Sequence, residues 1–464
     1  MLTARITAGE AQARPGVDPL FAELRQREFA RLDRDGHAYL DYTGSALYAE
    51  RQIRRHGALL LDATFGNPHA ESEASRASGR ALDLGRSLLL AHLDADPGEY
   101  AVCFTANATA AIKLVAESYP FGTEGACVLS ADNHNSVNGI REYARRSGAR
   151  VAYLALDDEL RLVGATDGLR REASRSRGPK LFAFPAQSNF SGVRHPLSLI
   201  DAAQELDYDV LLDAASFVSC SALSLRMIQP EFVALSFYKL FGYPTGLGAL
   251  VARRDALPRL ARPWFAGGTV DYASVQNDVH ALRAGADGFE DGTPNFLGVS
   301  ALPDGFALLD EVGMARLSTH ACRLTRLLLD GLRGLAHRDG SSLVRFYGPA
   351  DTADRGGTVA FNLIDRERRV IPYWEVESRA RNRGVSLRGG CFCNPGASEA
   401  AFRFDATTTA RCLRTGDFTI ERFLACLQDA GADVAVGALR ASVGMATNEA
   451  DVRRAIAVMA EFAH

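Results

Sequence analysis

The chain has 464 residues, 47% of them hydrophobic, and its 52 basic and 56 acidic residues give a formal net charge of -4. That size supports a large core, and without an excess of basic residues the chain is not expected to bind nucleic acid. No apolar run reaches the length of about 18 residues that spans a membrane, and the first residues lack the apolar stretch of a secretory signal.

The first 38 residues are polar and rich in Arg and Glu, so we expect an N-terminal arm with a short helix. Over residues 39–300, short apolar runs alternate with stretches whose apolar residues recur at helical spacing. Because the runs lack strict alternation, they predict an α/β domain with a mainly parallel seven-stranded sheet that helices cover on both faces. The expected strands are 100–105, 125–130, 149–156, 180–185, 209–214, 231–236 and 246–252.

The pattern changes from about residue 301. Long amphipathic stretches at 314–335 and 451–463 flank the apolar run 358–365 and a glycine-rich segment with two cysteines. We therefore predict a smaller α+β domain over 301–464, which carries this cysteine loop, SLRGGCFCNPG, at residues 386–396.

Lysine is rare, and any covalent amine chemistry must use Lys113, Lys180 or Lys239. Lys113 falls on the first helix after the strand 100–105, and Lys180 begins a strand. Lys239 directly follows a strand, among apolar and aromatic neighbours in a turn rich in Gly and Pro. Such neighbours desolvate an ammonium group and lower its pKa, which suits a lysine that forms a Schiff base.

Polar residues follow the expected strands at their carboxyl ends, where a parallel sheet binds its ligands. Thr109 lies at the start of a helix whose free N–H groups could hold a phosphate, or form an ordinary N-cap. His134 could stack on a ring or cap a helix, and Asn189 could donate to a phenolate oxygen. Asp213 ends an apolar strand, where a carboxylate needs a partner such as a protonated pyridine nitrogen. Together these residues indicate a site for pyridoxal phosphate (PLP).

The eight cysteines are scattered along a chain without a secretory signal, which favours reduced thiols and a cytoplasmic protein. Cys391 and Cys393 lie one residue apart. This spacing is shorter than that of usual zinc ligands, and no second Cys or His pair follows at a suitable distance, so no metal site is expected.

The order of these motifs resembles the class V aminotransferase-like branch of fold type I PLP enzymes, and specifically the cysteine desulfurases. The resemblance covers residues 39–452. Four segments are most similar to the desulfurase domain of molybdenum cofactor sulfurases: GNPH (66–69), SFYKLFGYPTGLGAL (236–250), FEDGTPNFL (289–297) and SLRGGCFCNPGA (386–397).

The resemblance implies roles for individual residues. Lys239 is implied as the Schiff-base lysine, Asp213 as the partner of the pyridine nitrogen and His134 as the histidine that stacks on the ring. Tyr238 stands where many desulfurases have a histidine, and Ser216 where many have a glutamine. The other implied cofactor contacts are Ala108, Thr109, Asn189, Ser216, Ser236, Tyr238 and Thr293, the last from the second subunit of a homodimer.

The resemblance also assigns the cysteine loop. Arg388 is implied to bind the carboxylate of the substrate, and aligning Arg388–Gly390 with the Arg-x-Gly of the family places Cys393 at the nucleophilic position. The implied reaction moves the sulfur of L-cysteine onto Cys393 as a persulfide and releases alanine. Cys391 could be a resolving thiol, a second sulfur carrier or a packing residue, and we favour packing.

Eukaryotic molybdenum cofactor sulfurases carry a further C-terminal domain, whereas this chain ends at His464. We therefore expect a separate sulfur acceptor, either a protein or a small molecule, and neither nucleic acid nor membrane as a partner. The alternatives are a PLP-dependent C–S lyase, epimerase or aminotransferase acting on another amino acid, a selenocysteine lyase, and a catalytically silent scaffold.

Overall fold

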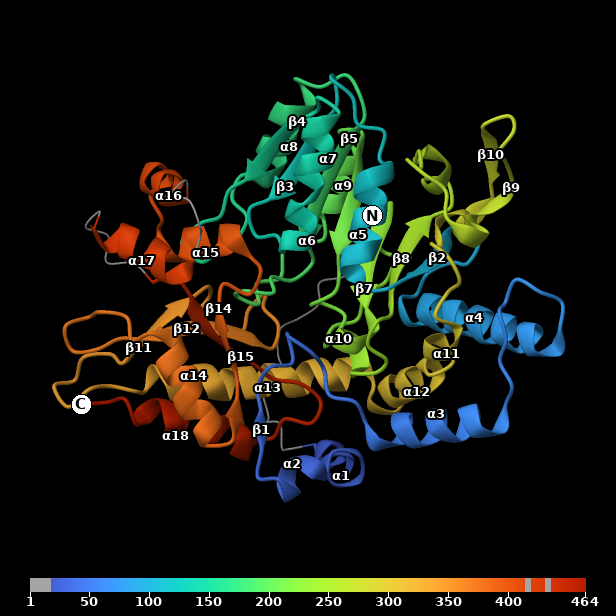
Figure 1. Cartoon of the computed structure of the whole chain (residues 1–464). Coiled ribbons are helices and arrows are strands. Elements are labelled where there is room, and N and C mark those ends of the chain that lie inside the picture. Colours follow the sequence, from blue (N-terminus) through green and yellow to red (C-terminus); the bar gives the residue numbers. More distant parts are fainter. Residues whose placement is uncertain (1–17, 414–418, 430–434) are drawn as a thin grey trace, which may run out of the picture.

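The computed structural model in Figure 1 describes residues 18–413, 419–429 and 435–464. Its largest element is a seven-stranded sheet in the order β2-β8-β7-β6-β5-β3-β4. The first strand along this order is antiparallel to the second, the second is antiparallel to the third, and all other neighbours are parallel. The strands are β2 (Tyr100–Thr105), β3 (Ala126–Ser130), β4 (Arg150–Leu154), β5 (Lys180–Pro185), β6 (Tyr208–Asp213), β7 (Phe232–Ser236) and β8 (Gly248–Arg253). The predicted fold class and the seven expected strands are confirmed.

Helices cover both faces of this sheet because successive side chains of each buried strand point to opposite faces. Leu181 packs into the cluster that holds Ile112, and its neighbour Phe182 packs into the cluster that holds Leu169. The first face is covered by α5 (Ala108–Ser118), α6 (Asn135–Asn138) and α7 (Ile140–Arg146). The second face is covered by α4 (Glu73–His92), α8 (Ala165–Ala173), α9 (Leu199–Gln204) and α12 (Leu302–Val312).

Shorter elements complete this part of the chain. A two-stranded hairpin projects from it at the upper right of Figure 1, formed by β9 (Val270–Ser274) and β10 (Val279–Leu282). The remaining helices are α3 (Glu50–Asp62), α10 (Phe237–Phe241) and α11 (Phe296–Val299), with 3-10 turns at Leu257–Arg259, Gly267–Thr269 and Gly285–Phe289.

The C-terminal part contains a four-stranded antiparallel sheet in the order β11-β12-β15-β14. Its strands are β11 (Val344–Tyr347), β12 (Thr358–Leu363), β14 (Arg388–Gly390) and β15 (Ala438–Ser442). Its helices are α13 (Met314–Arg333), α14 (Tyr373–Asn382), α15 (Pro395–Phe402), α16 (Ala406–Leu413), α17 (Ile420–Asp429) and α18 (Glu449–Ala460). The small sheet lies beside the carboxyl ends of the large sheet (Figure 1), which brings the cysteine loop to the edge where α10, the helix that carries Lys239, begins.

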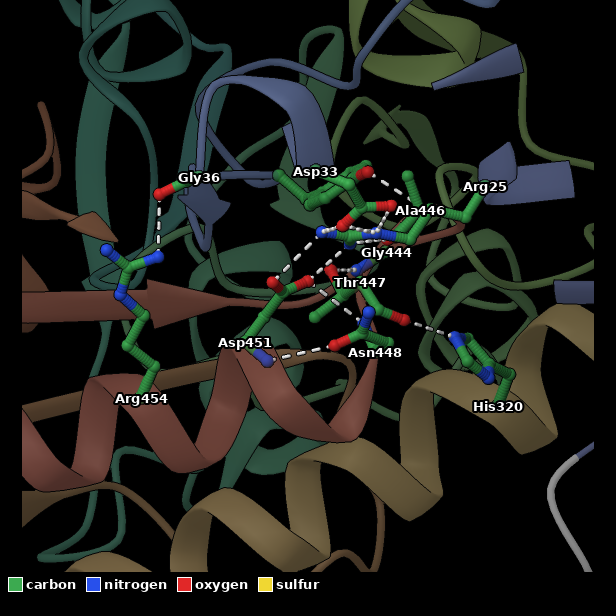
Figure 2. Close-up of polar contacts among 11 residues, drawn as sticks. Arg25, Asp33, Gly36, His320, Gly444, Ala446, Thr447, Asn448, Asp451 and Arg454 are labelled. Carbon is green, nitrogen blue, oxygen red and sulfur yellow. Dashed lines mark hydrogen bonds and ion pairs between the residues drawn. The ribbon is translucent and has the colours of Figure 1, made fainter. Parts of the chain in front are cut away.

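The N-terminal segment packs on this C-terminal part. Its elements are α1 (Pro19–Glu28), α2 (Arg31–Arg34) and β1 (Ala38–Tyr39), and β1 pairs in parallel with β13 (Val385–Ser386). Figure 2 shows the contact: Arg25 of α1 pairs with Asp33 and with Asp451 of α18, and also donates to the carbonyl of Ala446. The predicted domain boundaries at residues 38 and 300 stay a prediction.

Two of the eight cysteines, Cys412 and Cys426, form a disulfide between α16 and α17. The expectation of reduced thiols is wrong for this pair. The two helices pack against each other and bring the Cα atoms to 5.7 Å, a normal separation for a disulfide, although the two cysteines are 14 positions apart in the sequence. The free cysteines are Cys103, Cys127, Cys220, Cys322, Cys391 and Cys393.

None of the helices that the structure describes is long and apolar enough to cross a membrane.

Candidate active site

Lys239 lies on α10, which begins directly after β7. Phe237, Leu240 and Phe241 of this helix point into the core, which leaves Lys239 half-buried on the opposite side. Burial lowers the pKa of Lys239, and the nearby carboxylate of Asp213 only partly opposes this effect. Among the described residues, its ammonium has no hydrogen-bond or ion-pair partner. Such a lysine is readily deprotonated to the neutral amine that a Schiff base needs.

Asp213 and His134 come from two other strand ends of the same sheet. Asp213 ends β6, beside β7, and its Oδ1 accepts the N–H of Ala215 at 3.0 Å. His134 is the N-cap of α6, and its Nδ1 accepts the N–H of Ser136 at 3.1 Å, so the proton of the neutral ring lies on Nε2. Burial lowers the pKa of His134, and the charge of Lys239 lowers it further. The histidine is therefore a neutral ring beside the lysine.

The N-terminus of α5 lies next to this cluster and provides a place for an anion. The N–H of Ala108 donates to Ser236 Oγ at 2.8 Å, which ties the start of α5 to the start of α10. Asn107 caps the helix through its side chain. Among the described residues, the N–H of Thr109 has no acceptor, so it remains available to a phosphate oxygen.

Ser136 is a site residue that the sequence analysis missed. Its hydroxyl lies 2.7 Å from Thr109 Oγ1 and 2.9 Å from His134 Nδ1. It therefore links the proposed phosphate-binding turn to the proposed ring-stacking histidine. The only hint in the sequence is its place two residues after His134, where an N-cap usually finds its partner.

Asn189, Tyr238 and Ser216 are the other predicted cofactor contacts near these strand ends, and their neighbours differ. Asn189 Nδ2 donates to the carbonyl of Phe392 in the cysteine loop at 2.6 Å. Burial raises the pKa of Tyr238, and the charge of Arg388 opposes this shift, which places the phenol in the field of Arg388. The carbonyl of Ser216 accepts Nε2 of Gln187 at 3.1 Å.

Arg388 does not stand free but pairs with Asp41. Its Nε and Nη2 lie 2.9 and 2.7 Å from Asp41 Oδ2, and Arg440 Nη2 lies 2.9 Å from Oδ1. A Cβ atom at Gly44 would lie 2.5 Å from the Asp41 carboxylate, so a glycine is needed for this close approach. Among the described residues, Nη1 of Arg388 has no acceptor, and the half-exposed guanidinium keeps three N–H groups for a substrate carboxylate.

Cys391 and Cys393 lie in a tight turn. The N–H of Asn394 donates to the carbonyl of Cys391 at 2.9 Å, and Phe392 and Cys393 both have positive φ, 54° and 56°, as the central residues of a type I′ turn do. The Cys393 thiol is exposed. Burial lowers the pKa of Lys239, and a thiolate on Cys393 would partly oppose this effect. Cys391 is half-buried and its Sγ donates to the carbonyl of Val436. These contacts agree with a packing role for Cys391.

Thr293 lies apart from the Lys239 cluster. It is exposed and lines a cavity of about 320 Å³ together with Thr105, Ala106 and Ala110, at the flank of the proposed phosphate-binding turn. Its suggested contact with the cofactor of a second subunit stays a prediction. No group of three or more His, Cys, Asp or Glu side chains that could hold a metal ion occurs in the described part of the chain.

The residues present fit PLP. Within the part of the chain that the structure describes, the half-buried Lys239 has no partner for its ammonium and Thr109 has no acceptor for its N–H, as a covalent aldehyde and a phosphate group would require. Asp213 stands at the neighbouring strand end, where it could meet a pyridine nitrogen.

Comparison with curated proteins finds molybdenum cofactor sulfurases. The chain is 40% identical over 393 residues to molybdenum cofactor sulfurase 2 of Culex quinquefasciatus, covering 80% of this chain and 50% of that protein. It is 37% identical over 403 residues to the molybdenum cofactor sulfurase of Homo sapiens, covering 81% and 44%. The chain thus spans about half the length of the curated relatives it matches.

Solved structures share the fold. An apo cysteine desulfurase from Thermococcus onnurineus NA1 superposes with a TM-score of 0.77 at 21% identity, covering 95% of this chain and 97% of that chain. A C-DES mutant with glycine covalently linked to its PLP cofactor superposes with a TM-score of 0.69 at 16% identity, covering 94% and 99%. A family model described as Aminotransferase class-V matches residues 38–454. The fold, the PLP-compatible site and this match agree: the chain belongs to the aminotransferase class-V family, as the sequence motifs predicted.

Proposed function

We propose that this chain is a PLP-dependent cysteine desulfurase that takes the sulfur of L-cysteine onto Cys393, releases L-alanine and passes the sulfur to an acceptor. One observation supports the proposal. Burial lowers the pKa of Lys239, which has no partner among the described residues, and Lys239 lies near enough to Arg388 and to the exposed thiol of Cys393 for their charges to affect that pKa as well. The naming of the curated relatives as molybdenum cofactor sulfurases supports sulfur transfer as the outcome.

Each residue of the proposed site would have a different role in the reaction. PLP, when bound, withdraws electrons from the α carbon of the substrate. Arg388 would hold the substrate carboxylate through its free N–H groups. Lys239, whose pKa is lowered by burial, would take the α proton as a neutral amine. Asp213 would keep a proton on the pyridine nitrogen.

Cys393 would then perform the sulfur transfer. Its thiolate attacks the sulfur of the substrate, so that an S–S bond forms and the C–S bond breaks. The electron pair of the C–S bond stays with the substrate carbon, which takes up a proton to give alanine. The enzyme keeps the sulfur as a persulfide on Cys393, and no external oxidant is needed.

The test is product analysis with a reductant present. L-Cysteine should give sulfide and alanine in equal amounts, and far more than L-selenocysteine, L-cystine, L-aspartate or L-serine give of their products. Cys393→Ser should abolish the reaction, whereas Cys391→Ser serves as the matched control in the same turn and should keep most of it. Equal loss in both variants, or a better substrate among the other amino acids, would contradict the proposal.

A PLP-dependent C–S lyase is the second candidate, since one fold neighbour is described as the cystine C-S lyase C-DES in complex with cysteine persulfide. A lyase does not need Cys393, so retained turnover of L-cystine by the Cys393→Ser variant would favour it. An epimerase or aminotransferase would instead leave the C–S bond intact.

We also propose that the active unit is a homodimer. Large apolar side chains are exposed on α3 and around the β9–β10 hairpin, including Leu61, Trp264, Tyr272 and Val275. A second copy of the chain would cover them and bring Thr293 towards the cofactor of its partner. Light scattering should give about twice the chain mass of 50.0 kDa, and a fully active monomer would overturn the dimer.

The remaining proposals concern the substrate, the partners and the location of the protein in the cell. We propose L-cysteine as substrate, a separate protein or small molecule as sulfur acceptor, neither nucleic acid nor membrane as partner, and a cytoplasmic location. Pull-down of the persulfide form with candidate acceptors, followed by transfer of radiolabelled sulfur, would identify the acceptor.

A further inference from the structure

The turn that carries Cys393 has a backbone conformation that contacts with other parts of the chain must stabilise. Phe392 and Cys393 both have positive φ without being glycine, a conformation that L-residues rarely adopt and that persists where surrounding contacts impose it. The turn begins in the small sheet at β14, yet its contacts lead to the strand ends of the large sheet. The residues that impose the conformation therefore control where the Cys393 thiol stands.

Several large-sheet residues hold this turn: the N–H of Asn135 donates to the carbonyl of Cys393 at 2.7 Å, Asn189 holds Phe392, and Asp132, two residues after β3, holds Asn394. The Asp132 side chain is completely buried. Oδ1 accepts Asn394 Nδ2 at 2.7 Å and Ser188 Oγ at 2.8 Å, and Oδ2 accepts His195 Nε2 at 2.9 Å. All three groups donate to one carboxylate, and an ionised carboxylate suits them because it can only accept hydrogen bonds. Charge-assisted hydrogen bonds are about twice as strong as neutral ones.

His195 binds the second oxygen of the Asp132 carboxylate. Its ring is buried, and among the described residues Nδ1 has no hydrogen-bond partner. A proton on Nδ1 would leave a buried N–H without an acceptor, so the ring is neutral with its proton on Nε2, where it donates to Asp132. This fixes the carboxylate and aims Oδ1 at Asn394.

Asn394 transmits this contact to the turn. Its backbone N–H closes the turn on the carbonyl of Cys391, and its side chain caps α15 by accepting the N–H of Ala397 at 3.2 Å. The same amide donates to Asn189 Oδ1 at 3.0 Å, and Asn189 in turn holds the carbonyl of Phe392. Asn394 is thus one of the residues where the large-sheet contacts meet the cysteine turn.

We propose that Asp132, oriented by His195, is a positioning residue that fixes the turn bearing Cys393 through its hydrogen bond to Asn394. The inference rests on the proposed function, in which Cys393 takes the sulfur of the substrate. Asp132 contacts neither the thiol nor Lys239, so it acts only by setting the position of the turn.

The decisive variant is Asn394→Asp. It has the same shape and keeps an acceptor for the N-cap of α15, but it sets a second carboxylate against Asp132 in place of a donor. Hydrogen exchange of residues 391–397 in the resting protein should become about tenfold faster or more, and persulfide formation in a single turnover should slow by about tenfold or more, with cofactor content unchanged. Relative to the wild-type rate at the same pH, the rate of the variant should recover as the pH falls, because a proton shared by the two carboxyl groups restores a hydrogen bond between them.

Two further variants keep the test conclusive. Asn394→Ser keeps the N-cap without adding charge and should show the same loss without the recovery at low pH. Asn448→Asp makes the same chemical change at the N-cap of α18 and should leave both readouts at the wild-type level. Wild-type exchange and wild-type persulfide rates in Asn394→Asp would overturn the inference. Absence of any persulfide in the wild-type protein would instead overturn the proposed function, and faster exchange in the variant would still support the positioning role.

Discussion

Asp41 binds Arg388 along one edge of the guanidinium group, with Nε and Nη2 at 2.9 and 2.7 Å from Oδ2, and Nη1 has no acceptor among the residues that the structure describes. The same carboxylate also pairs with the buried Arg440. One aspartate thus both aims the proposed substrate-binding arginine and neutralises a buried charge behind it.

Asp41→Asn is expected to raise the KM for L-cysteine by about tenfold while kcat changes less, because Arg388 loses the charge that orients it. The free energy of unfolding should fall by about 3 kcal/mol, since Arg440 is left buried without its counter-charge. Steady-state kinetics and urea titration measure the two effects.

Arg388→Lys separates these effects. A lysine lacks the planar fork, so KM should rise as in Asp41→Asn, but Asp41 remains to pair with Arg440 and stability should be nearly kept. An unchanged KM in both variants would show that the substrate carboxylate binds elsewhere.

The cofactor is expected on Lys239 alone. Borohydride reduction of the holoprotein followed by peptide mapping should find the pyridoxyl group on the Lys239 peptide. The other two lysines serve as internal controls: the exposed Lys113 pairs with Glu117, also on α5, and Lys180 lies near Asp207. A label on either of them would refute the site.

The buried ring of His320 should make the stability of the protein depend on pH. The ring stacks on Phe21 of α1 and donates from Nε2 to the carbonyl of Thr447 (Figure 2). Burial lowers its pKa from 6.5 to about 4. The unfolded chain therefore takes up the proton first as the pH falls, and stability is lost between about pH 6.5 and about pH 4.

Between pH 7 and pH 4 the wild-type protein should lose about 3 kcal/mol more free energy of unfolding than His320→Gln, which cannot titrate. Chemical denaturation at several pH values measures the difference. Parallel pH curves for the two proteins would contradict the lowered pKa.

The sequence predicted those site residues whose position follows from the secondary structure just before them. A short apolar strand followed at once by a polar residue indicated Lys239 and Asp213, because the carboxyl ends of strands in a parallel sheet meet at one edge. The large sheet followed from the same pattern, since a strand buried on both faces needs a continuous apolar run.

The sequence could not predict the contacts that hold these residues. Asp41 and Arg440 are 399 residues apart in the chain, and Asp132 and Asn394 are 262 apart. No local pattern pairs them, because each side chain alone has an ordinary structural explanation. The Cys412–Cys426 disulfide was missed for the same reason: it depends on how α16 and α17 pack.

Sulfur transfer to Cys393 can be tested by mass spectrometry of the holoprotein after brief exposure to L-cysteine, with the peptide that spans residues 386–397 fragmented to locate added sulfur. We expect one extra sulfur on Cys393 and none on Cys391, whose thiol donates to the carbonyl of Val436. Cys393→Ala should bind cofactor and substrate but gain no sulfur. Extra sulfur on Cys391 with Cys393 unmodified, or none on either cysteine while L-cysteine is consumed, would contradict sulfur transfer to Cys393.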